Sequence, residues 1–181
     1  MESPDGEKVL EKIVTDDSLA KLPIFRGMDA QQRHEALSMA QRVEVGPGEK
    51  LIVQGELVQN LWFVLSGHCE VKRRTSAGKE LKLAELGPST QFGEMSFFHA
   101  SPHSADVIAT TDMQLIRLSR ADYDRLCESG NPVAFKLALN SLEQLAERLR
   151  RTDQWITDLV TQKNHQPTVS EWTSFRELVF R

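Results

Sequence analysis

Long apolar runs are absent from this 181-residue sequence, and its first six residues form an acidic start without an apolar core. A helix that crosses a bilayer needs about 18–20 consecutive apolar residues. A secretory leader needs a shorter apolar segment behind basic residues. We therefore expect no membrane span and no signal peptide, and we expect a cytoplasmic protein.

Cysteine is scarce, since Cys69 and Cys127 are the two in the chain and form no C-x-x-C pair. We expect both to be reduced, partly buried thiols. His99 and His103 are four residues apart, but Pro102 interrupts any helix that would carry both, and no third ligand is evident. A zinc site needs three or four ligands, so we expect no metal site.

Catalytic signatures are also missing, because the sequence has no nucleophile elbow, no P-loop and no paired carboxylates. The 22 basic and 26 acidic residues give a formal net charge of −4. That balance does not attract nucleic acid or an anionic membrane. We therefore expect a binding or interaction protein, without catalytic residues and without a cofactor.

The first part of the chain has helical patterns. An apolar face at 9–14 predicts one helix, and 16–18 can cap a second that runs to Leu22 before Pro23. Asp29 can cap a third helix whose apolar side ends near Ala40. We expect residues 1–21 to form a leader and N-terminal helices ahead of the main domain.

From Gln41 the apolar period changes to two, and turn dipeptides recur about every ten residues. Short strands at such intervals are typical of an all-β sandwich, roll or barrel. The predicted strands lie near 43–45 and at 50–53, 61–65, 69–73, 80–85, 105–109 and 113–118. Residues 92–103 do not alternate and separate the last two strands from the others.

Helical spacing returns at Ser119, which can cap a helix that runs to Leu126. Pro132 is suited to the first turn of the next helix, which we expect to continue to about Gln162. One heptad position carries Phe135, Leu142, Leu149 and Ile156, and the other carries Ala138, Leu145, Thr152 and Leu159. This seam predicts a dimerisation helix over 131–163. Alternatively, the stripe packs on the chain's own β domain, or it serves both purposes. The tail at 164–181 is expected to form a short helix.

Four ordered motifs resemble the cyclic-nucleotide-binding domain family: 22–25, 45–56, 61–67 and 92–105. The resemblance spans about Leu22 to Gln162 and implies an α+β, mainly β fold. This fold is a double-stranded β-helix, or jelly-roll-like β-roll, over 22–130. N-terminal helices and a long C-terminal dimer helix flank it. The last motif corresponds to the family's phosphate-binding cassette.

Within that cassette, a Gly-Glu pair before a short helix is weak evidence alone, because an acid in the first turn also favours the helix dipole. The resemblance implies that Glu94 holds the ribose 2′-OH and that backbone N–H groups from Gly93 to Ser96 face the cyclic phosphate. Ser104 adds a hydroxyl, and Thr152 meets the purine or sets the register of the seam. The candidate ligand-binding residues are Phe92, Gly93, Glu94, Met95, Ser96, His103, Ser104 and Thr152.

His103 departs from the pattern, because the family has an arginine at this position. Arginine is always charged, whereas histidine is mostly neutral at pH 7. Losing a charged hydrogen bond weakens binding roughly 10- to 150-fold. If a protonated imidazole replaces the arginine, affinity should rise as the pH falls from about 8 to about 6, by at most about tenfold per unit. Alternatively, His103 is a solvated residue at a loop tip.

Two functions remain open at this point. The chain is a regulatory sensor that binds cAMP or cGMP and relays the signal through its dimer helix to an effector protein. Alternatively, its degenerate cassette has lost the ligand and it is a dimeric interaction scaffold. Only some 18 residues follow Lys163, too few for the helix-turn-helix of the family's transcription factors. We therefore expect no direct nucleic-acid binding.

Overall fold

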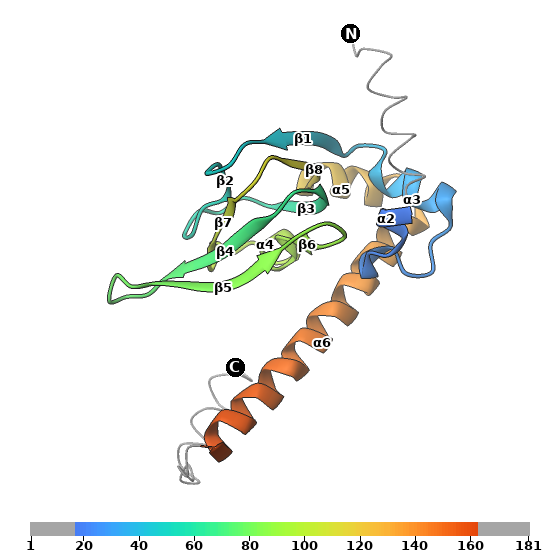
Figure 1. The fold of residues 1–181 in the computed structure, drawn as a ribbon. Helices are drawn as coiled ribbons and strands as arrows, with labels where there is room; N and C mark the ends of the chain where they lie inside the picture. Colours follow the sequence, from blue (N-terminus) through green and yellow to red (C-terminus); the bar gives the residue numbers. More distant parts are fainter. Residues whose placement is uncertain (1–16, 163–181) are drawn as a thin grey trace. The chain divides into compact units, whose positions relative to one another are not determined.

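The computed structural model describes residues 17–162 (Figure 1). The expected helix over 9–14 and the expected helix in the tail lie outside these residues. In chain order the helices and strands are α2 (Asp17–Ala20), the 3-10 helix η1 (Pro23–Phe25), α3 (Ala30–Leu37), β1 (Gln41–Val45), β2 (Lys50–Ile52), β3 (Asn60–Ser66), β4 (Cys69–Arg74), β5 (Glu80–Leu86), β6 (Gln91–Phe92), α4 (Glu94–Phe98), β7 (Asp106–Ala109), β8 (Met113–Ser119), α5 (Arg120–Glu128) and α6 (Pro132–Gln162).

The strands form two four-stranded antiparallel sheets. One sheet has the order β1-β8-β3-β6, and the other has the order β2-β7-β4-β5. Each sheet combines strands that are distant in the sequence, as expected for a roll and not for a simple meander. The turn between β4 and β5 lies at the end of the roll far from α2 and α3 (Figure 1). The predicted β-roll with flanking helices is therefore confirmed.

Alternation along β3 explains why the protein has two cores. Leu61 and Phe63 face the helices and pack with residues of α3, α5 and α6, whereas Trp62 and Val64 face the inside of the roll. Strand side chains alternate between the two faces of a sheet. A strand that is apolar on both faces therefore separates a helical layer from the interior of the roll.

Side chains cap the helices as predicted. The Asp29 carboxylate accepts the N–H of Gln32 at 2.8 Å, and the Gln32 side chain accepts the N–H of Asp29 in return. The Ser119 hydroxyl accepts the N–H of Asp122 at 3.2 Å at the start of α5. Such caps satisfy N–H groups that have no acceptor within the helix.

Helix α6 begins and ends where its pattern predicted, but two compact units share it. The first unit is Met1–Ser141 and the second is Leu142–Arg181. Within the first unit, Val133, Ala134 and Leu137 are buried against the helical core, whereas Phe135 on the heptad seam is 71% exposed. Ala138, on the other heptad position, is partly buried against the same core, so the face that packs on the chain's own domain overlaps the seam at Ala138 and leaves Phe135 exposed.

The two cysteines differ in their surroundings. Cys69 is buried inside the roll, and this burial raises the pKa of its thiol to about 11. Cys127 is exposed, so the expectation of two partly buried thiols is wrong for it. Both thiols are free.

Over residues 17–162, no helix is long and apolar enough to cross a bilayer. The same residues contain no group of three side chains suited to hold a metal ion.

Candidate functional site

The cassette begins with an abrupt change from strand to helix at Gly93. This residue has φ +92°, and an added Cβ would lie 2.4 Å from the carbonyl oxygen of Asn60. Any other residue would strain the backbone and collide with β3. Glycine is therefore required for β6 to turn directly into α4.

Glu94 is the first residue of α4 and is only 9% exposed. A buried carboxylate is unfavourable unless hydrogen-bond donors surround it. The contact of Glu94 with a ribose hydroxyl stays a prediction. The position differs from that of an acid that merely favours a helix dipole, because such an acid needs no burial.

His103 is fixed by backbone and side chain together. Its N–H donates to the carbonyl of Glu56 at 2.9 Å, and its own carbonyl accepts the N–H of Gly55 at 2.9 Å. Its Nδ1 lies 3.0 Å from the hydroxyl oxygen of Ser96 on α4. The ring is 8% exposed. The alternative that His103 is a solvated residue at a loop tip is therefore wrong.

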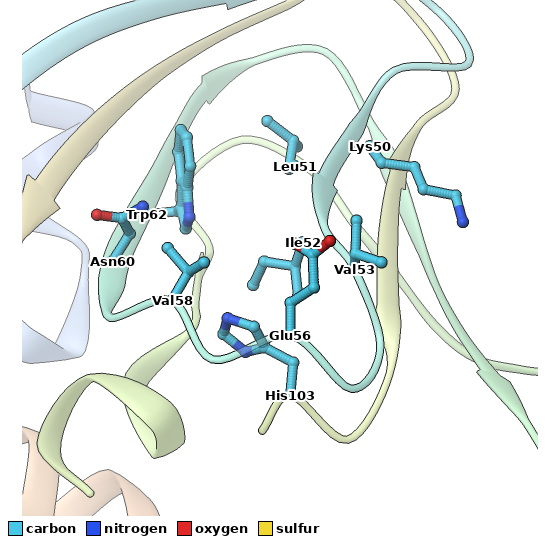
Figure 2. Close-up of a pocket in the computed structure, with 9 residues that line it drawn as sticks. All are labelled: Lys50, Leu51, Ile52, Val53, Glu56, Val58, Asn60, Trp62 and His103. Atoms are coloured by element: carbon cyan, nitrogen blue, oxygen red, sulfur yellow. The ribbon is translucent and has the colours of Figure 1, made fainter. Parts of the chain in front are cut away.

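A pocket of about 100 Å³ lies beside His103. Figure 2 shows the imidazole pointing from its loop toward Val58 and Trp62, with Ile52 on the opposite wall. Small-molecule sites usually measure about 300–1,000 Å³, so a nucleotide would need this pocket to widen. The lining residues are Lys50, Leu51, Ile52, Val53, Glu56, Val58, Asn60, Trp62 and His103.

The walls of this pocket were missed by the sequence analysis. Trp62 was assigned only to a strand, but its ring stacks on Phe92 with centroids 6.1 Å apart and planes 14° from parallel. The guanidinium of Arg117 lies 5.9 Å from the centre of the Trp62 ring. Phe92 thus has a packing role inside the roll. Trp62 lies in the motif 61–67, but that motif does not indicate its contact with Phe92, which is brought about by the pairing of β6 with β3.

Positive charge at the edge of the pocket is already neutralised. The Lys50 ammonium lies 3.1 Å from the Asp106 carboxylate, which also accepts the N–H of Gln54 at 2.7 Å. Burial alone would raise the pKa of Asp106, but the hydrogen bonds from Gln54 and Lys50 hold it below its ordinary value. In Figure 2 the Lys50 ammonium points away from His103. Lys50 therefore does not supply, in this arrangement, the positive charge of the arginine that the family has at position 103.

The remaining candidate residues are more dispersed. Met95 is 51% exposed on α4, and Ser104 is exposed in the loop after His103. Thr152 belongs to the second compact unit, where its hydroxyl donates to the carbonyl of Arg148 at 2.9 Å. The structure thus brings Ser96 and His103 into contact. The ligand-binding roles of Met95, Ser104 and Thr152 stay predictions.

Comparison with known proteins now identifies the family. The family model of the cyclic nucleotide-binding domain matches residues 42–129, which include most of β1, the whole cassette and α5. The chain belongs to the cyclic nucleotide-binding domain family. It is 38% identical to the cyclic AMP receptor protein of Thermus thermophilus over 131 residues, which is 72% of this chain and 59% of that protein.

A second curated relative is the CRP-like cAMP-activated global transcriptional regulator of Mycobacterium tuberculosis. It is 30% identical over 145 residues, which is 80% of this chain and 63% of that protein. This family member therefore spans only 59% and 63% of the lengths of these two relatives. The activities of the whole relatives do not transfer to it directly.

Solved structures agree with this assignment. The catabolite activator protein of Thermus thermophilus superimposes with a TM-score of 0.69 at 37% identity, over 77% of this chain and 63% of that one. The N-terminal domain of a transcriptional regulator from Streptomyces coelicolor gives 0.64 at 30% identity, over 77% and 96%. A cyclic nucleotide-binding domain from Methylobacillus flagellatus gives 0.72 at 21% identity, over 91% and 89%, and supports the fold alone.

Proposed function

We propose that this cyclic nucleotide-binding domain is a non-catalytic sensor that binds cAMP or cGMP between Phe92 and Ser104. The observation that carries the proposal is the presence of two buried polar residues in the cassette. Glu94 follows the left-handed Gly93, and His103 lines the pocket of about 100 Å³. The names of the two curated relatives, a cyclic AMP receptor and a cAMP-activated regulator, favour cAMP as the ligand.

In the proposed complex, Glu94 accepts the ribose 2′-OH and the N–H groups of the first turn of α4 face the cyclic phosphate. The first N–H groups of a helix lack acceptors within the helix and so are suited to an anion. His103 donates to the same phosphate. Ser104 adds a hydroxyl contact when the ligand is bound.

The test of this site is titration calorimetry with cAMP, cGMP and 2′-deoxy-cAMP. Glu94→Gln should weaken cAMP binding roughly 10- to 150-fold, because a charge-assisted hydrogen bond is lost. The same substitution should change the affinity for 2′-deoxy-cAMP much less, since that ligand has no hydroxyl for Glu94. Glu128→Gln, at the end of α5, is the matched control. Equal losses for both ligands would show that Glu94 does not bind the ribose.

We further propose that the chain forms a homodimer through 131–163 and relays occupancy to an effector protein by this helix. The exposed heptad residues Phe135, Leu142 and Leu149 support this part of the proposal. A row of exposed apolar side chains on a helix is typical of a helix–helix interface. Sedimentation at micromolar concentration tests it, because a monomer would contradict it.

The alternative function is a dimeric scaffold that has lost its ligand. It is favoured by the small pocket and by His103 at the position of the family's arginine. His103→Arg distinguishes the two functions. If this variant and the unmodified protein bind neither nucleotide at millimolar concentration while the dimer persists, the scaffold is the better description.

A further inference from the structure

Ser96 and His103 form a buried polar pair that connects the two ends of the cassette. Ser96 is 4% exposed and His103 is 8% exposed, and the hydroxyl oxygen lies 3.0 Å from Nδ1. Ser96 comes from the first turn of α4, whereas His103 comes from the loop that leads into β7. The family resemblance implies a role only for the backbone N–H of Ser96. The structure gives its side chain a distinct partner.

This contact leaves the other ring nitrogen of His103 for the pocket. Nδ1 is bound to Ser96, and Figure 2 shows the ring directed toward Val58 and the open space before Trp62. The exocyclic oxygens of a cyclic phosphate accept hydrogen bonds but cannot donate them. Nε2 therefore assists such a ligand only when it carries a hydrogen.

We propose that Ser96 is a positioning residue whose hydroxyl donates to Nδ1, so that the neutral imidazole of His103 presents Nε2–H to the pocket. A neutral imidazole has one N–H, and the bond made by one nitrogen determines which nitrogen carries it. The identity of the anion rests on the proposed function. The tautomer does not, since the Ser96 contact exists without a ligand.

The opposite arrangement would have the reverse effect. If Nδ1–H donated to Ser96, the Nε2 lone pair would face the phosphate oxygens and repel them, and only a protonated ring would bind. The ionisable residues of the elements around His103 are Lys50 and Glu56 in the pocket wall and Glu94 on α4. Lys50 is already paired with Asp106. The experiment therefore measures the protonation state of the His103 ring directly.

The first experiment is nitrogen NMR of the full chain labelled at histidine, without nucleotide, from about pH 5.5 to 9. His103→Asn assigns the His103 signals by their disappearance. Above its titration we expect the neutral ring to be protonated at Nε2, with Nδ1 as a hydrogen-bonded acceptor. Ser96→Ala should move the Nδ1 signal toward that of a nitrogen without a donor. A ring protonated at Nδ1, or an Nδ1 signal unaffected by Ser96→Ala, would overturn the proposal.

The second experiment compares two neutral amides at position 103 by titration with cAMP. His103→Gln places an N–H donor near the site of Nε2, whereas His103→Asn places it near Nδ1. We expect the glutamine variant to bind within about fivefold of the unmodified protein and the asparagine variant to bind about tenfold more weakly or worse. The unmodified protein should change affinity less than about threefold between pH 6.5 and 8.5.

Equal losses in both variants, with affinity rising about tenfold per unit as the pH falls, would show that charge and not a neutral donor is required. That result would restore the steep pH dependence expected from the sequence and would contradict the proposal. Should the unmodified protein bind no nucleotide, the proposed function fails. The NMR experiment would still decide the role of Ser96.

Discussion

Helix α6 has two stretches whose apolar residues have different surroundings. In residues 132–141, Val133, Ala134 and Leu137 are 1–2% exposed in the helical core. In residues 142–162, Leu142 is 63% exposed and Leu149 is 54% exposed. The apolar heptad runs through both stretches, and its first member, Phe135, is exposed even where the helix is anchored. The anchored face and the heptad seam therefore overlap at Ala138, which is partly buried against the helical core, and differ at Phe135, which is exposed.

This difference shows why one amphipathic pattern predicted the helix but not its packing. A surface helix usually has one apolar stripe, and that stripe faces its own core. Here residues 132–141 carry a second apolar stripe that overlaps the first at Ala138, while the seam residues Phe135, Leu142 and Leu149 stay exposed. The polar residue Asn140 belongs to the anchored face, where its amide donates to the carbonyl of Ile24 at 2.7 Å.

The largest expected effect comes from truncating the anchored face. Leu137→Ala should lower the free energy of unfolding by about 2–5 kcal/mol, because it removes a buried side chain and leaves a cavity. Leu142→Ala, the matched change on the exposed seam, should alter the stability of the roll by less than about 0.5 kcal/mol. Urea unfolding at two protein concentrations separates folding from association. If Leu137→Ala and Leu142→Ala lowered the free energy of unfolding equally at both protein concentrations, the distinction between the two faces would be wrong.

The next effect concerns association. Leu149→Arg should raise the dissociation constant of the proposed dimer at least about a hundredfold, roughly 3 kcal/mol, because it places a charge in an apolar seam. Analytical ultracentrifugation measures this change, and circular dichroism should show an intact roll. Arg150→Ala on the same helix is the control. A dimer that survives Leu149→Arg would mean that the copies associate elsewhere.

Much of the fold followed from local chemistry. The alternation in 43–118 predicted seven of the strands, and Asp29 and Ser119 predicted two caps that the structure contains. Strand β6 was missed because Gln91 and Phe92 are too few to show a period, and they become a strand only through pairing with Trp62 and Phe63. A segment of two residues shows no sequence pattern that would predict such long-range pairing.

The candidate site was also predictable only in part, because contacts between residues distant in the sequence are not visible in local patterns. The Gly93-Glu94 pair and its neighbours were recognised from their order along the chain. The contact between Ser96 and His103 was not predicted, because the two residues are seven positions apart, a loop lies between them, and no periodicity connects them. The wall formed by Val58 and Trp62 comes from a distant segment that curls back beside the cassette.

The smallest effect tests how the anchored stretch is held at its first turn. The hydroxyl of Tyr123 donates to the carbonyl of Ala134 at 3.1 Å, which joins α5 to α6. Tyr123→Phe removes this bond and should lower the free energy of unfolding by about 1 kcal/mol near pH 8. Because Tyr123 faces the core and not the seam, the variant should still dimerise.

The pH dependence of that effect follows from the tyrosine itself. Burial, assisted by a hydrogen bond with Cys127, raises the pKa of Tyr123 to about 12, whereas an unfolded tyrosine ionises near pH 10. A raised pKa in the folded state means that the contribution of Tyr123 is complete below about pH 10 and is lost as the pH rises toward 12. The stability gap between the unmodified protein and Tyr123→Phe should therefore shrink above pH 10. Tyr123 is the one tyrosine in the chain, so the ultraviolet absorbance of tyrosinate reports its ionisation directly. The variant Cys127→Ala shows how much of the raised pKa of Tyr123 comes from the thiol of Cys127. An absorbance midpoint near 10 in the folded protein would contradict the burial of this contact, and with it the account of how α6 is anchored.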